Sequence, residues 1–286
     1  MTAPPLDRPA SEFCAVVLAA GEGRRLRPLT ERLPKALCPV GNVTLLDRAL
    51  DRVARLGPAG PGAVAVNAAY LAGQVVERVA GRAHLSVEPG GPLGTAGGVA
   101  RLRDWIDGRG VLVGNADAYL SDPASPPGRD IAALVHGWDG ATVRMLTTAA
   151  RAGERPEFGG RRFAGFSLLP WTYVRRLTAE PSNLVHLVWR PAEAVGDLEL
   201  VGYGGTYIDT GTPADYLAAN LHAGAGRPLI DASATVTGRC EASVVGADAV
   251  VRGTVLRCVV WPGATVSAGE HLVDAVRVGT DLTVRP

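Results

Sequence analysis

Lysine is almost absent from this chain of 286 residues: of its 29 basic side chains, only Lys35 is a lysine. The chain otherwise uses arginine wherever a positive charge is needed, so a lysine points to a special requirement. Lysine supplies a compact, mobile point charge, whereas the guanidinium of arginine is a planar fork. Lys35 is either a lysine retained by chance on a solvated loop or a residue whose position requires a compact, mobile charge. Its place after the glycine loop described below favours the second interpretation.

Cysteine and histidine are also scarce, and their spacing excludes the common metal motifs. The four cysteines form no C-x-x-C pair, and the five histidines show neither an H-x-x-H nor an H-E-x-x-H spacing. A zinc site is therefore not expected. Isolated cysteines, one of them inside an apolar run, are typical of reduced thiols in a cytoplasmic protein.

Long apolar runs and an excess of charge are missing as well. No apolar run approaches the ~20 residues of a membrane span. The net charge of +1 gives no reason to expect nucleic acid or a membrane surface as a partner. Residues 1–13 are polar and proline-rich and contain no signal-peptide core. We expect a cytoplasmic globular protein with one large domain or a large and a small one.

What the sequence does contain is a glycine loop after a predicted strand. The run Cys14–Ala20 has the length and β-branching of a buried strand. It delivers Gly21 and Gly23 at its carboxyl end, where open α/β sheets bind their ligands. Glycines let backbone amides approach a phosphate closely, and several arginines and Lys35 follow. This combination favours a polyphosphate-binding loop.

Two familiar glycine motifs do not fit this loop. The dinucleotide fingerprint G-x-G-x-x-G would need glycine where Leu26 stands, and a Walker A loop needs a Gly-Lys pair, which the chain lacks. From Leu18 to Lys35 the sequence instead resembles the signature of the sugar-1-phosphate nucleotidylyltransferases, or nucleoside-diphosphate-sugar pyrophosphorylases. Every specified position of that signature is present: L-A-A-G-x-G-x-R-L-x-P-L-T-x-x-x-P-K.

A second glycine-rich segment, Gly90–Gly98, opens a predicted helix that runs to about Ile106. Taken alone, it could be a flexible loop before that helix. Its L-G-T-A-G-G part resembles the segment with which the family closes over the base and the sugar, in the form typical of mannose-1-phosphate guanylyltransferases. The resemblance implies a preference for GTP and nucleotide contacts from the following residues: Leu18, Ala19, Ala20, Gly21, Gly23, Gly94 and Thr95.

Two aspartates are candidate magnesium ligands. Asp117 follows a predicted strand, Val111–Gly114, and Asn115-Ala-Asp117 resembles a family triplet, N-G-D, whose aspartate binds magnesium. Asn115 is a further candidate nucleotide contact. The stretch from Asp209 to Asn220 resembles D-x-G-T-P-x-x-Y-L-x-A-N, whose aspartate supplies a second ligand. Each aspartate could instead be an ordinary turn residue, but two carboxylates from different strand ends can share one hard cation.

Between residues 151 and 166 the sequence departs from the family. The family carries a hairpin with a Glu-Lys-Pro that helps to hold the sugar, and Glu154-Arg155-Pro156 could be a shortened counterpart. The run Phe163–Phe166 resembles the family's N-A-G-I-Y, with Phe163 in place of the asparagine. Gly165 is therefore a candidate sugar contact, and the shortened segment suggests a reduced lid or an unusual acceptor.

Alternating strands and helices predict the α/β class, with a Rossmann-like, mostly parallel sheet in a nucleotidyltransferase domain spanning residues 1–225. Residues 207–208 read as a strand end, and Thr212 as the N-cap of a helix. The other predicted elements are helices at 44–56, 71–80 and 131–138, and strands at 63–68, 85–88 and 142–148.

The remaining residues, 226–286, show a different pattern. Valines at 236, 245, 251, 260 and 266 alternate by nine and six, so that they repeat at fifteen, and Leu272 and Val278 follow at six. Apolar rungs with glycine turns predict a short left-handed parallel β-helix of hexapeptide units. The tail is too short for an acyltransferase and lacks its histidine pattern. It is expected to stabilise the protein or to form a homo-oligomer.

These features predict a Mg²⁺-dependent enzyme that transfers a nucleoside monophosphate from an NTP to a sugar-1-phosphate and releases pyrophosphate. By resemblance, Arg25 neutralises the β- and γ-phosphates, and Lys35 bridges the α-phosphate and the sugar phosphate. Asp117 and Asp209 hold the metal. One alternative is transfer to a cyclitol or amino-sugar phosphate. Another, of a different class, is a non-catalytic paralogue that binds sugar nucleotides and regulates a partner.

Overall fold

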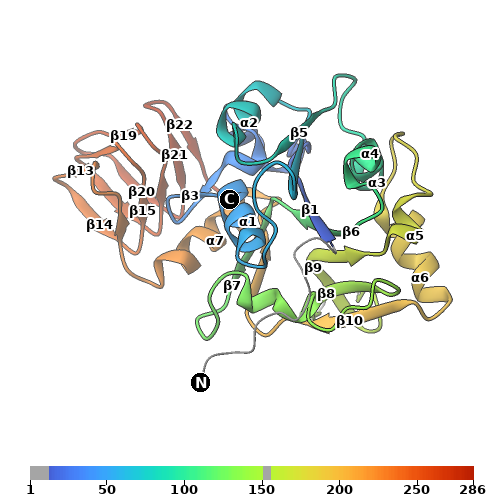
Figure 1. Ribbon diagram of the computed structural model, residues 1–286. Helices are drawn as coiled ribbons and strands as arrows, with labels where there is room; N and C mark the ends of the chain where they lie inside the picture. Colours follow the sequence, from blue (N-terminus) through green and yellow to red (C-terminus); the bar gives the residue numbers. More distant parts are fainter. Residues whose placement is uncertain (1–12, 151–155) are drawn as a thin grey trace. The chain divides into compact units, whose positions relative to one another are not determined.

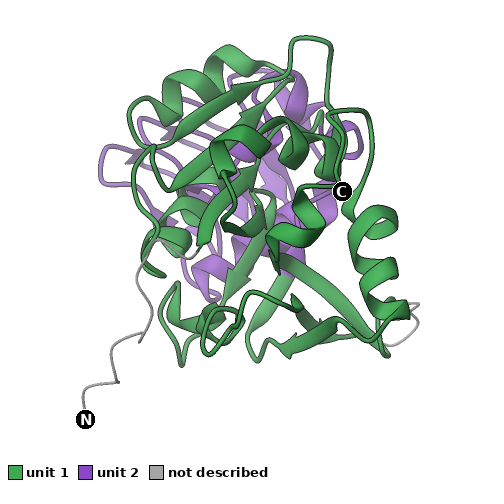
Figure 2. Ribbon diagram, turned by 45° about the vertical axis from the view of Figure 1, so that its right-hand side comes forward, with its two compact units in different colours: residues 1–22, 46–207 green, residues 23–45, 208–286 purple. Residues whose placement is uncertain are grey.

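The computed structural model describes residues 13–150 and 156–286, and these residues form two compact units (Figure 2). Unit 1 comprises the described residues up to Glu22 and Leu46–Tyr207. Unit 2 comprises Gly23–Leu45 and Ile208–Pro286, two segments that lie far apart in the sequence. The predicted domain boundary between residues 225 and 226 falls inside unit 2.

Unit 1 contains a sheet of seven strands in the order β10-β8-β9-β6-β1-β4-β5. In Figure 1 the labels of β10, β8, β9, β6 and β1 follow one another up the right half of the picture. Strand β9 is antiparallel to both of its neighbours, and all other pairs are parallel. The predicted mostly parallel sheet is confirmed. The strands are β1 (Phe13–Leu18), β4 (Val64–Ala68), β5 (His84–Val87), β6 (Gly110–Asn115), β8 (Val143–Ala149), β9 (Arg161–Leu169) and β10 (Leu198–Gly202).

The helices of this part of the chain are short and pack on the sheet. They are α1 (Leu45–Ala54), α2 (Ala72–Val79), α3 (Gly94–Arg101), α4 (Arg103–Ile106), α5 (Trp171–Val174) and α6 (Arg190–Ala194), with a π-helical turn at Val185–Trp189. Side chains of α3, α4 and α6 share one hydrophobic core with β1, β6 and β8. A helix that spans a membrane is not found among the described residues, because none is both long and apolar enough.

The helix predicted for residues 131–138 is wrong. The structure has a short 3₁₀ segment there, Arg129–Leu134. Gly128 and Gly137 flank it with positive φ angles of 87° and 61°, which interrupt a right-handed helix at both ends. Between these two glycines the chain adopts 3₁₀ geometry, which is common in short helical pieces.

Strand β1 is central and buried, which explains its uninterrupted apolar sequence. Cys14, Ala15, Val16 and Val17 are fully buried, with β4 paired on one side and β6 on the other. At its carboxyl end, the register places Leu18 beside Asn67 of β4 and Asn115 of β6. The sheet thereby brings three loop-bearing strand ends together at one edge, where α/β sheets bind ligands.

Unit 2 begins with the second half of the glycine loop. This segment forms three 3₁₀ turns, Arg24–Leu26, Leu29–Glu31 and Lys35–Leu37, followed by an antiparallel pair of β2 (Pro39–Val40) and β3 (Val43–Thr44). Helix α7 (Pro213–Gly224) starts as predicted, because the Thr212 side chain accepts a hydrogen bond from the Asp215 amide at 3.2 Å.

Two further strands flank the candidate metal ligands: β7 (Ala118–Ser121) follows Asp117, and β11 (Thr206–Asp209) ends at Asp209.

The tail forms three stacks of short parallel strands, coloured orange to red in Figure 1, which confirms the predicted β-helix. The period of fifteen is confirmed by its register, because Val245 pairs with Val260, and Val251 with Val266. The left-handed sense stays a prediction. Its strands are β12 (Leu229–Ile230), β13 (Thr235–Val236), β14 (Arg239–Glu241), β15 (Val244–Val245), β16 (Val250–Val251), β17 (Thr254–Leu256), β18 (Val259–Val260), β19 (Thr265–Val266), β20 (His271–Val273), β21 (Val276–Val278) and β22 (Leu282–Val284).

The last coil departs from the valine pattern. Leu272 pairs with Val255, seventeen residues earlier, in a third stack, β14-β17-β20, that the pattern did not reveal. Strand β22 turns back antiparallel to β21. This hairpin covers the edge of one of the three stacks.

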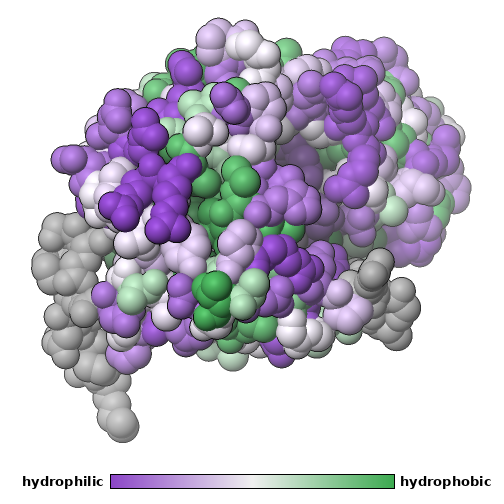
Figure 3. Space-filling view, turned by 90° about the vertical axis from the view of Figure 1, so that its right-hand side faces the viewer, coloured by the Kyte–Doolittle hydropathy of each residue, from purple (hydrophilic) through white to green (hydrophobic). Residues whose placement is uncertain are grey.

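The exposed large hydrophobic side chains come from several elements. Among the described residues they are Val43, Val87, Leu187, Val195, Ile230 and Val273. On the face shown in Figure 3, hydrophobic residues (green) reach the surface near the middle, bordered by hydrophilic ones (purple). Scattered exposed apolar residues are normal in globular proteins and carry no functional argument.

Candidate active site

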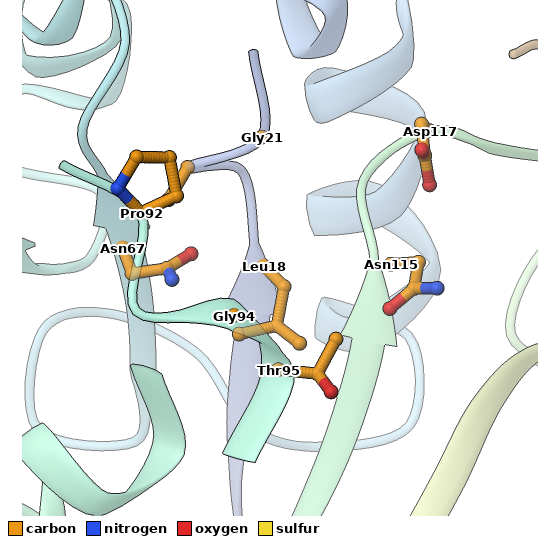
Figure 4. A pocket seen from close by; sticks show the side chains of 9 residues that line it. Leu18, Gly21, Asn67, Pro92, Gly94, Thr95, Asn115 and Asp117 are labelled. Atoms are coloured by element: carbon orange, nitrogen blue, oxygen red, sulfur yellow. The ribbon is translucent and has the colours of Figure 1, made fainter. Parts of the chain in front are cut away.

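A pocket lies at the carboxyl edge of the sheet in unit 1 (Figure 4). Seven of the predicted site residues line it together with Asn67 and Pro92: Leu18, Ala20, Gly21, Gly94, Thr95, Asn115 and Asp117. These nine residues come from the ends of β1, β4 and β6, from the turn after β6, and from the loop before α3 and the start of α3 itself. The structure therefore brings together, at one place, residues that the sequence had connected only through separate motifs.

A buried polar network holds two loops of this pocket together. The Asn67 side chain accepts a hydrogen bond from the Ala19 amide at 2.7 Å and donates one to Glu88 at 2.8 Å. The other oxygen of Glu88 accepts from the Leu93 amide at 2.8 Å. Asn67 and Glu88 are 2% and 3% exposed, so water competes little for these bonds. The network ties the loop after β1 to the loop before α3.

Sequence reasoning missed Asn67 and Glu88. A signal was present, because each is a polar residue at the end of a predicted apolar strand. Strand ends carry many polar turn residues, however, and the sequence does not show that these two face each other. Their pairing depends on the register between β4 and β5.

Glycines at the start of α3 serve close packing, whereas a Cβ on Gly90 or Gly91, in the preceding loop, would meet nothing within 4 Å. A Cβ atom on Gly94 would collide with the backbone oxygen of Ser182, and one on Gly98 would lie 2.6 Å from the Asn67 amide nitrogen. The Thr95 hydroxyl accepts a hydrogen bond from the Leu184 amide at 2.9 Å. Residues 94–98 are therefore a packed helix start. Its nucleotide contacts stay a prediction.

Asp117 stands in the turn between β6 and β7 and is partly exposed beside the pocket. The chain is fixed there by Gly165, which has a φ of 83° and on which a Cβ would collide with the side chain of Ala118. Gly165 thus has a packing role next to Asp117. Its predicted sugar contact is not tested by this geometry.

In unit 2, Arg25 and Lys35 converge on Asp209. The Lys35 ammonium lies 3.4 Å from one carboxylate oxygen of Asp209, and the Arg25 guanidinium lies 3.3 Å from the other. The Lys35 side chain is only 9% exposed, whereas that of Arg25 is 69% exposed. Gly211 leaves room for this pair, because a Cβ there would lie 2.5 Å from the Arg25 guanidinium. A buried amine held by one carboxylate supports the functional interpretation of Lys35.

The glycine loop folds back to place Lys35. Gly23 has a φ of 62°, and a Cβ there would lie 2.8 Å from Thr30 and 3.0 Å from the Cβ of Lys35. The Thr30 hydroxyl donates to the Gly23 carbonyl at 2.9 Å. Burial raises the pKa of the neighbouring Cys38 thiol to about 12, although the charge of Lys35 acts in the opposite direction. This thiol therefore stays neutral beside the ammonium.

The carboxylates suit magnesium but do not form a closed metal cage. The described residues contain no cluster of three or more His, Cys, Asp or Glu side chains that could hold a metal. Mg²⁺ usually takes one or two carboxylates and completes its shell with water and substrate phosphates. Asp117 lies in unit 1 and Asp209 in unit 2, and their sharing of one ion stays a prediction. Asp209 would also have to exchange its contacts with Arg25 and Lys35.

The sugar side of the predicted site is described only in part. Glu154 and Arg155 lie outside the described residues. Phe163, which replaces the family's asparagine, packs against Trp189 with ring centroids 4.5 Å apart. It therefore joins β9 to the π-helical turn at Val185–Trp189 through an aromatic contact.

Comparison with known proteins identifies the family. Residues 15–196 match the MobA-like NTP transferase domain, and this range is more than half of the chain. The chain belongs to this family. The resemblance seen in Leu18–Lys35 is thereby confirmed.

Within this NTP transferase family, relatives differ in the nucleotide that their names specify. A Neisseria meningitidis N-acetylmuramate alpha-1-phosphate uridylyltransferase is 38% identical over 36% of this chain and 46% of the relative. A Schizosaccharomyces pombe mannose-1-phosphate guanyltransferase is 29% identical over 79% of this chain and 74% of the relative. The chain spans about half the length of this N. meningitidis protein, 46%, and of a Caulobacter vibrioides relative of the same name, 52%.

A solved structure supports the fold. It is that of a Bacillus anthracis protein described as a glucose-1-phosphate thymidylyltransferase, with a TM-score of 0.61 and 17% sequence identity. The alignment covers 74% of this chain and 95% of that one. At this identity the likeness shows the α/β fold and nothing about the substrate.

Proposed function

We propose that this protein transfers a nucleoside monophosphate from an NTP to a sugar-1-phosphate. A phosphate oxygen of the sugar phosphate attacks the α-phosphorus, a new P–O bond forms, and the bond to the β-phosphate oxygen breaks. Pyrophosphate leaves with the electron pair. The observation that carries this proposal is Lys35, the single lysine of the chain, buried after a glycine loop and 3.4 Å from Asp209.

The residues act by alignment and charge neutralisation. Arg25 is exposed and suited to the β- and γ-phosphates, which carry the charge that leaves. Lys35 is buried and suited to the α-phosphate and the attacking phosphate, where negative charge concentrates. Both cations contact the single carboxylate of Asp209 in the structure, and an incoming polyphosphate competes with that carboxylate. The Asn67–Glu88 network keeps the pocket loops in place.

Magnesium belongs to the same proposal. Asp117 and Asp209 would hold it, and when bound it would supply charge neutralisation and Lewis acidity at the phosphates. Asp117 supports this role because its carboxylate stands beside the pocket at a strand end. The four free cysteines support a cytoplasmic location, and the β-helix tail is proposed as the surface of a homo-oligomer.

The nucleotide and the acceptor are chosen from the relatives. GTP and a mannose-1-phosphate-like acceptor agree with the L-G-T-A-G-G motif and with the S. pombe relative. UTP with an amino-sugar phosphate is the second candidate, favoured by the N. meningitidis and Caulobacter vibrioides relatives, whose names specify N-acetylmuramate alpha-1-phosphate.

The test is pyrophosphate release from each common NTP crossed with several sugar-1-phosphates, with Mg²⁺ and with EDTA. The panel includes mannose-1-phosphate, N-acetylmuramate alpha-1-phosphate and a cyclitol phosphate. Lys35→Ala and Asp117→Ala are expected to lower the rate by about 10²–10³ each. Arg239→Ala, which alters an exposed ion pair in the tail, is the control and is expected to keep wild-type activity. Absence of release across the panel, with sugar nucleotides still bound, would instead support a regulatory paralogue.

A further inference from the structure

A buried hydrogen-bond chain connects the β-helix to the segment that carries Lys35. The indole N–H of Trp261, in the tail, donates to the Tyr216 hydroxyl at 2.9 Å. That hydroxyl donates to the Pro39 carbonyl at 2.5 Å. Trp261 is 5% exposed and Tyr216 is fully buried. Their rings also meet edge to face, with centroids 6.4 Å apart. All three residues belong to unit 2.

Two asparagines reinforce the same connection. Asn220 of α7 accepts from the Gly41 amide at 3.0 Å and donates to the Pro39 carbonyl at 3.4 Å. Asn42 donates to the Val245 carbonyl of β15 at 3.0 Å. The turn at residues 39–42 is therefore held from α7 and from the tail itself.

The stretch between Pro39 and Lys35 is compact and transmits this constraint. The Cys38 amide donates to the Lys35 carbonyl at 3.1 Å, and the Leu37 amide donates to the Pro34 carbonyl at 2.8 Å. Lys35, Leu37 and Cys38 are all buried. A displacement at Pro39 cannot be absorbed by flexible chain before it reaches Lys35.

We propose that Trp261 is a positioning residue for Lys35 and that the β-helix is a working part of the nucleotidyl-transfer site. Trp261 orients the Tyr216 hydroxyl, and Tyr216 fixes the Pro39 carbonyl. The position of Pro39 in turn determines, through the 3₁₀ turn at Lys35–Leu37, where the ammonium of Lys35 lies. The catalytic consequence rests on the proposed function, whereas the position of Lys35 can be measured without it.

The single lysine makes that position directly measurable. Reductive methylation with ¹³C-formaldehyde labels Lys35 and the amino terminus alone, so a ¹³C NMR spectrum contains one side-chain signal. The variants are Trp261→Phe, which keeps a ring and loses the N–H, Tyr216→Phe, and the double variant. Trp138→Phe is the matched control, because its indole donates to the Thr142 carbonyl at 2.8 Å in unit 1. Ser243→Ala is a second control that weakens the tail at its Cys258 contact.

We expect Trp261→Phe to shift the Lys35 signal and to lower kcat for pyrophosphate release by about two- to tenfold, the usual effect of one hydrogen bond. KM for the NTP should change less, because Lys35 acts mainly in the transition state. The double variant should resemble Tyr216→Phe, since both changes break one chain. Both controls should leave the Lys35 signal and kcat unchanged, because a weaker tail opens more often but keeps the Trp261–Tyr216–Pro39 hydrogen bonds in the folded state.

Outcomes separate the two proposals. A Lys35 signal that stays in place in Trp261→Phe and Tyr216→Phe overturns the positioning role, whatever the activity. If signal and kcat change equally in Ser243→Ala, the effect is general loss of tail stability and the proposal is also wrong. Should the unmodified protein release no pyrophosphate, the proposed function fails, while a shifted Lys35 signal still upholds the positioning role.

Discussion

At the scale of single residues, the two glycines of the loop after β1 do different work. Gly23 has a left-handed backbone and touches Thr30 and Lys35, whereas a Cβ on Gly21 would meet nothing within 4 Å. Gly21 lines the pocket. One glycine therefore serves the shape of the loop, and the other leaves space for a ligand.

Alanine at these two positions should separate the roles. Gly23→Ala is expected to lower the free energy of unfolding by about 1–2 kcal/mol, the cost of a left-handed backbone, and to reduce activity. Gly21→Ala should leave thermal unfolding unchanged and weaken NTP binding. Thermal unfolding and titration calorimetry check the pair. An unstable Gly21→Ala protein would contradict the assignment.

Asp209 should compete with polyphosphate for its two cations. In Asp209→Asn we expect pyrophosphate release to fall by about 10²–10³, because the proposed magnesium ligand is lost. In EDTA, by contrast, the variant should bind NTP more tightly than the wild type, because Arg25 and Lys35 no longer face a carboxylate. Calorimetric titration measures this, with Asp281→Asn, from the exposed pair with Arg32, as the control. Equal or weaker binding in EDTA would refute the competition.

Two buried thiols predict a loss of stability in base. Burial raises the pKa of Cys14 from 9.0 to about 11 and that of Cys38 from 9.0 to about 12. Each thiol binds its proton more tightly in the folded state, so its contribution to stability is complete below pH 9 and declines as the pH rises towards the folded pKa. Urea midpoints should be flat from pH 7 to 8.5 and fall from pH 9 to 11.

The control for this prediction is Cys38→Ala. Its urea midpoint should fall less steeply between pH 9 and 11 than that of the wild type, because one of the raised thiol pKa values is gone. An equal slope would show that other groups cause the base sensitivity.

At the scale of elements, a buried ion pair fixes the strand that follows Asp117. Arg52 of α1 contacts Asp130 at 3.1 Å, and both side chains are at most 4% exposed. The same guanidinium donates to the Leu120 carbonyl of β7 at 3.0 Å. One side chain thus joins α1, β7 and the 3₁₀ segment at Asp130.

Breaking this pair should be costly. Arg52→Met leaves the buried carboxylate of Asp130 without its cation, and we expect the free energy of unfolding to fall by about 3–5 kcal/mol. Arg55→Met, from the exposed pair that Arg55, just beyond the end of α1, forms with Asp51 of that helix, should cost about 0.5 kcal/mol or less. Urea unfolding measures both. Similar losses in the two variants would mean that burial does not decide the energy of the pair.

The elements show which features local sequence could predict. Strand β1 and its loop, the Thr212 cap and the repeat of fifteen were predictable, because strand length, cap chemistry and rung spacing are local or periodic. The antiparallel strand β9 could not be predicted, because its insertion between β6 and β8 depends on contacts with segments that are distant in the sequence. The Asn67–Glu88 network and the hydrogen bond between Tyr216 and Pro39 could not be predicted for the same reason. Nothing near either partner in the sequence identifies the other.

At the scale of the whole molecule, unit 2 joins Gly23–Leu45 to a tail that lies far away in the sequence. A substitution at a buried valine of the β-helix should therefore lower the local stability of both segments together. Val251→Ala, at a fully buried position, removes about two methylenes and should lower stability locally by about 1.6 kcal/mol.

Hydrogen exchange can test this coupling. In Val251→Ala, amides of Leu37, Cys38 and Leu45 should exchange faster together with those of the tail, while β1 and β6 keep their protection. Val113→Ala, in β6, should show the opposite pattern. Faster exchange in the tail alone would show that unit 2 is not one cooperative unit.

The distance in sequence between Pro39 and Tyr216 also has a consequence for synthesis on the ribosome. The two residues are 177 positions apart, and translation adds about 5–20 residues per second. Tyr216, whose hydroxyl fixes the loop that bears Lys35, is therefore synthesised about 10–35 seconds after Pro39, and Trp261 is synthesised later still. Nucleotidyl transfer by a growing chain is expected only after the tail has been made, so the order of synthesis itself delays the appearance of a competent protein.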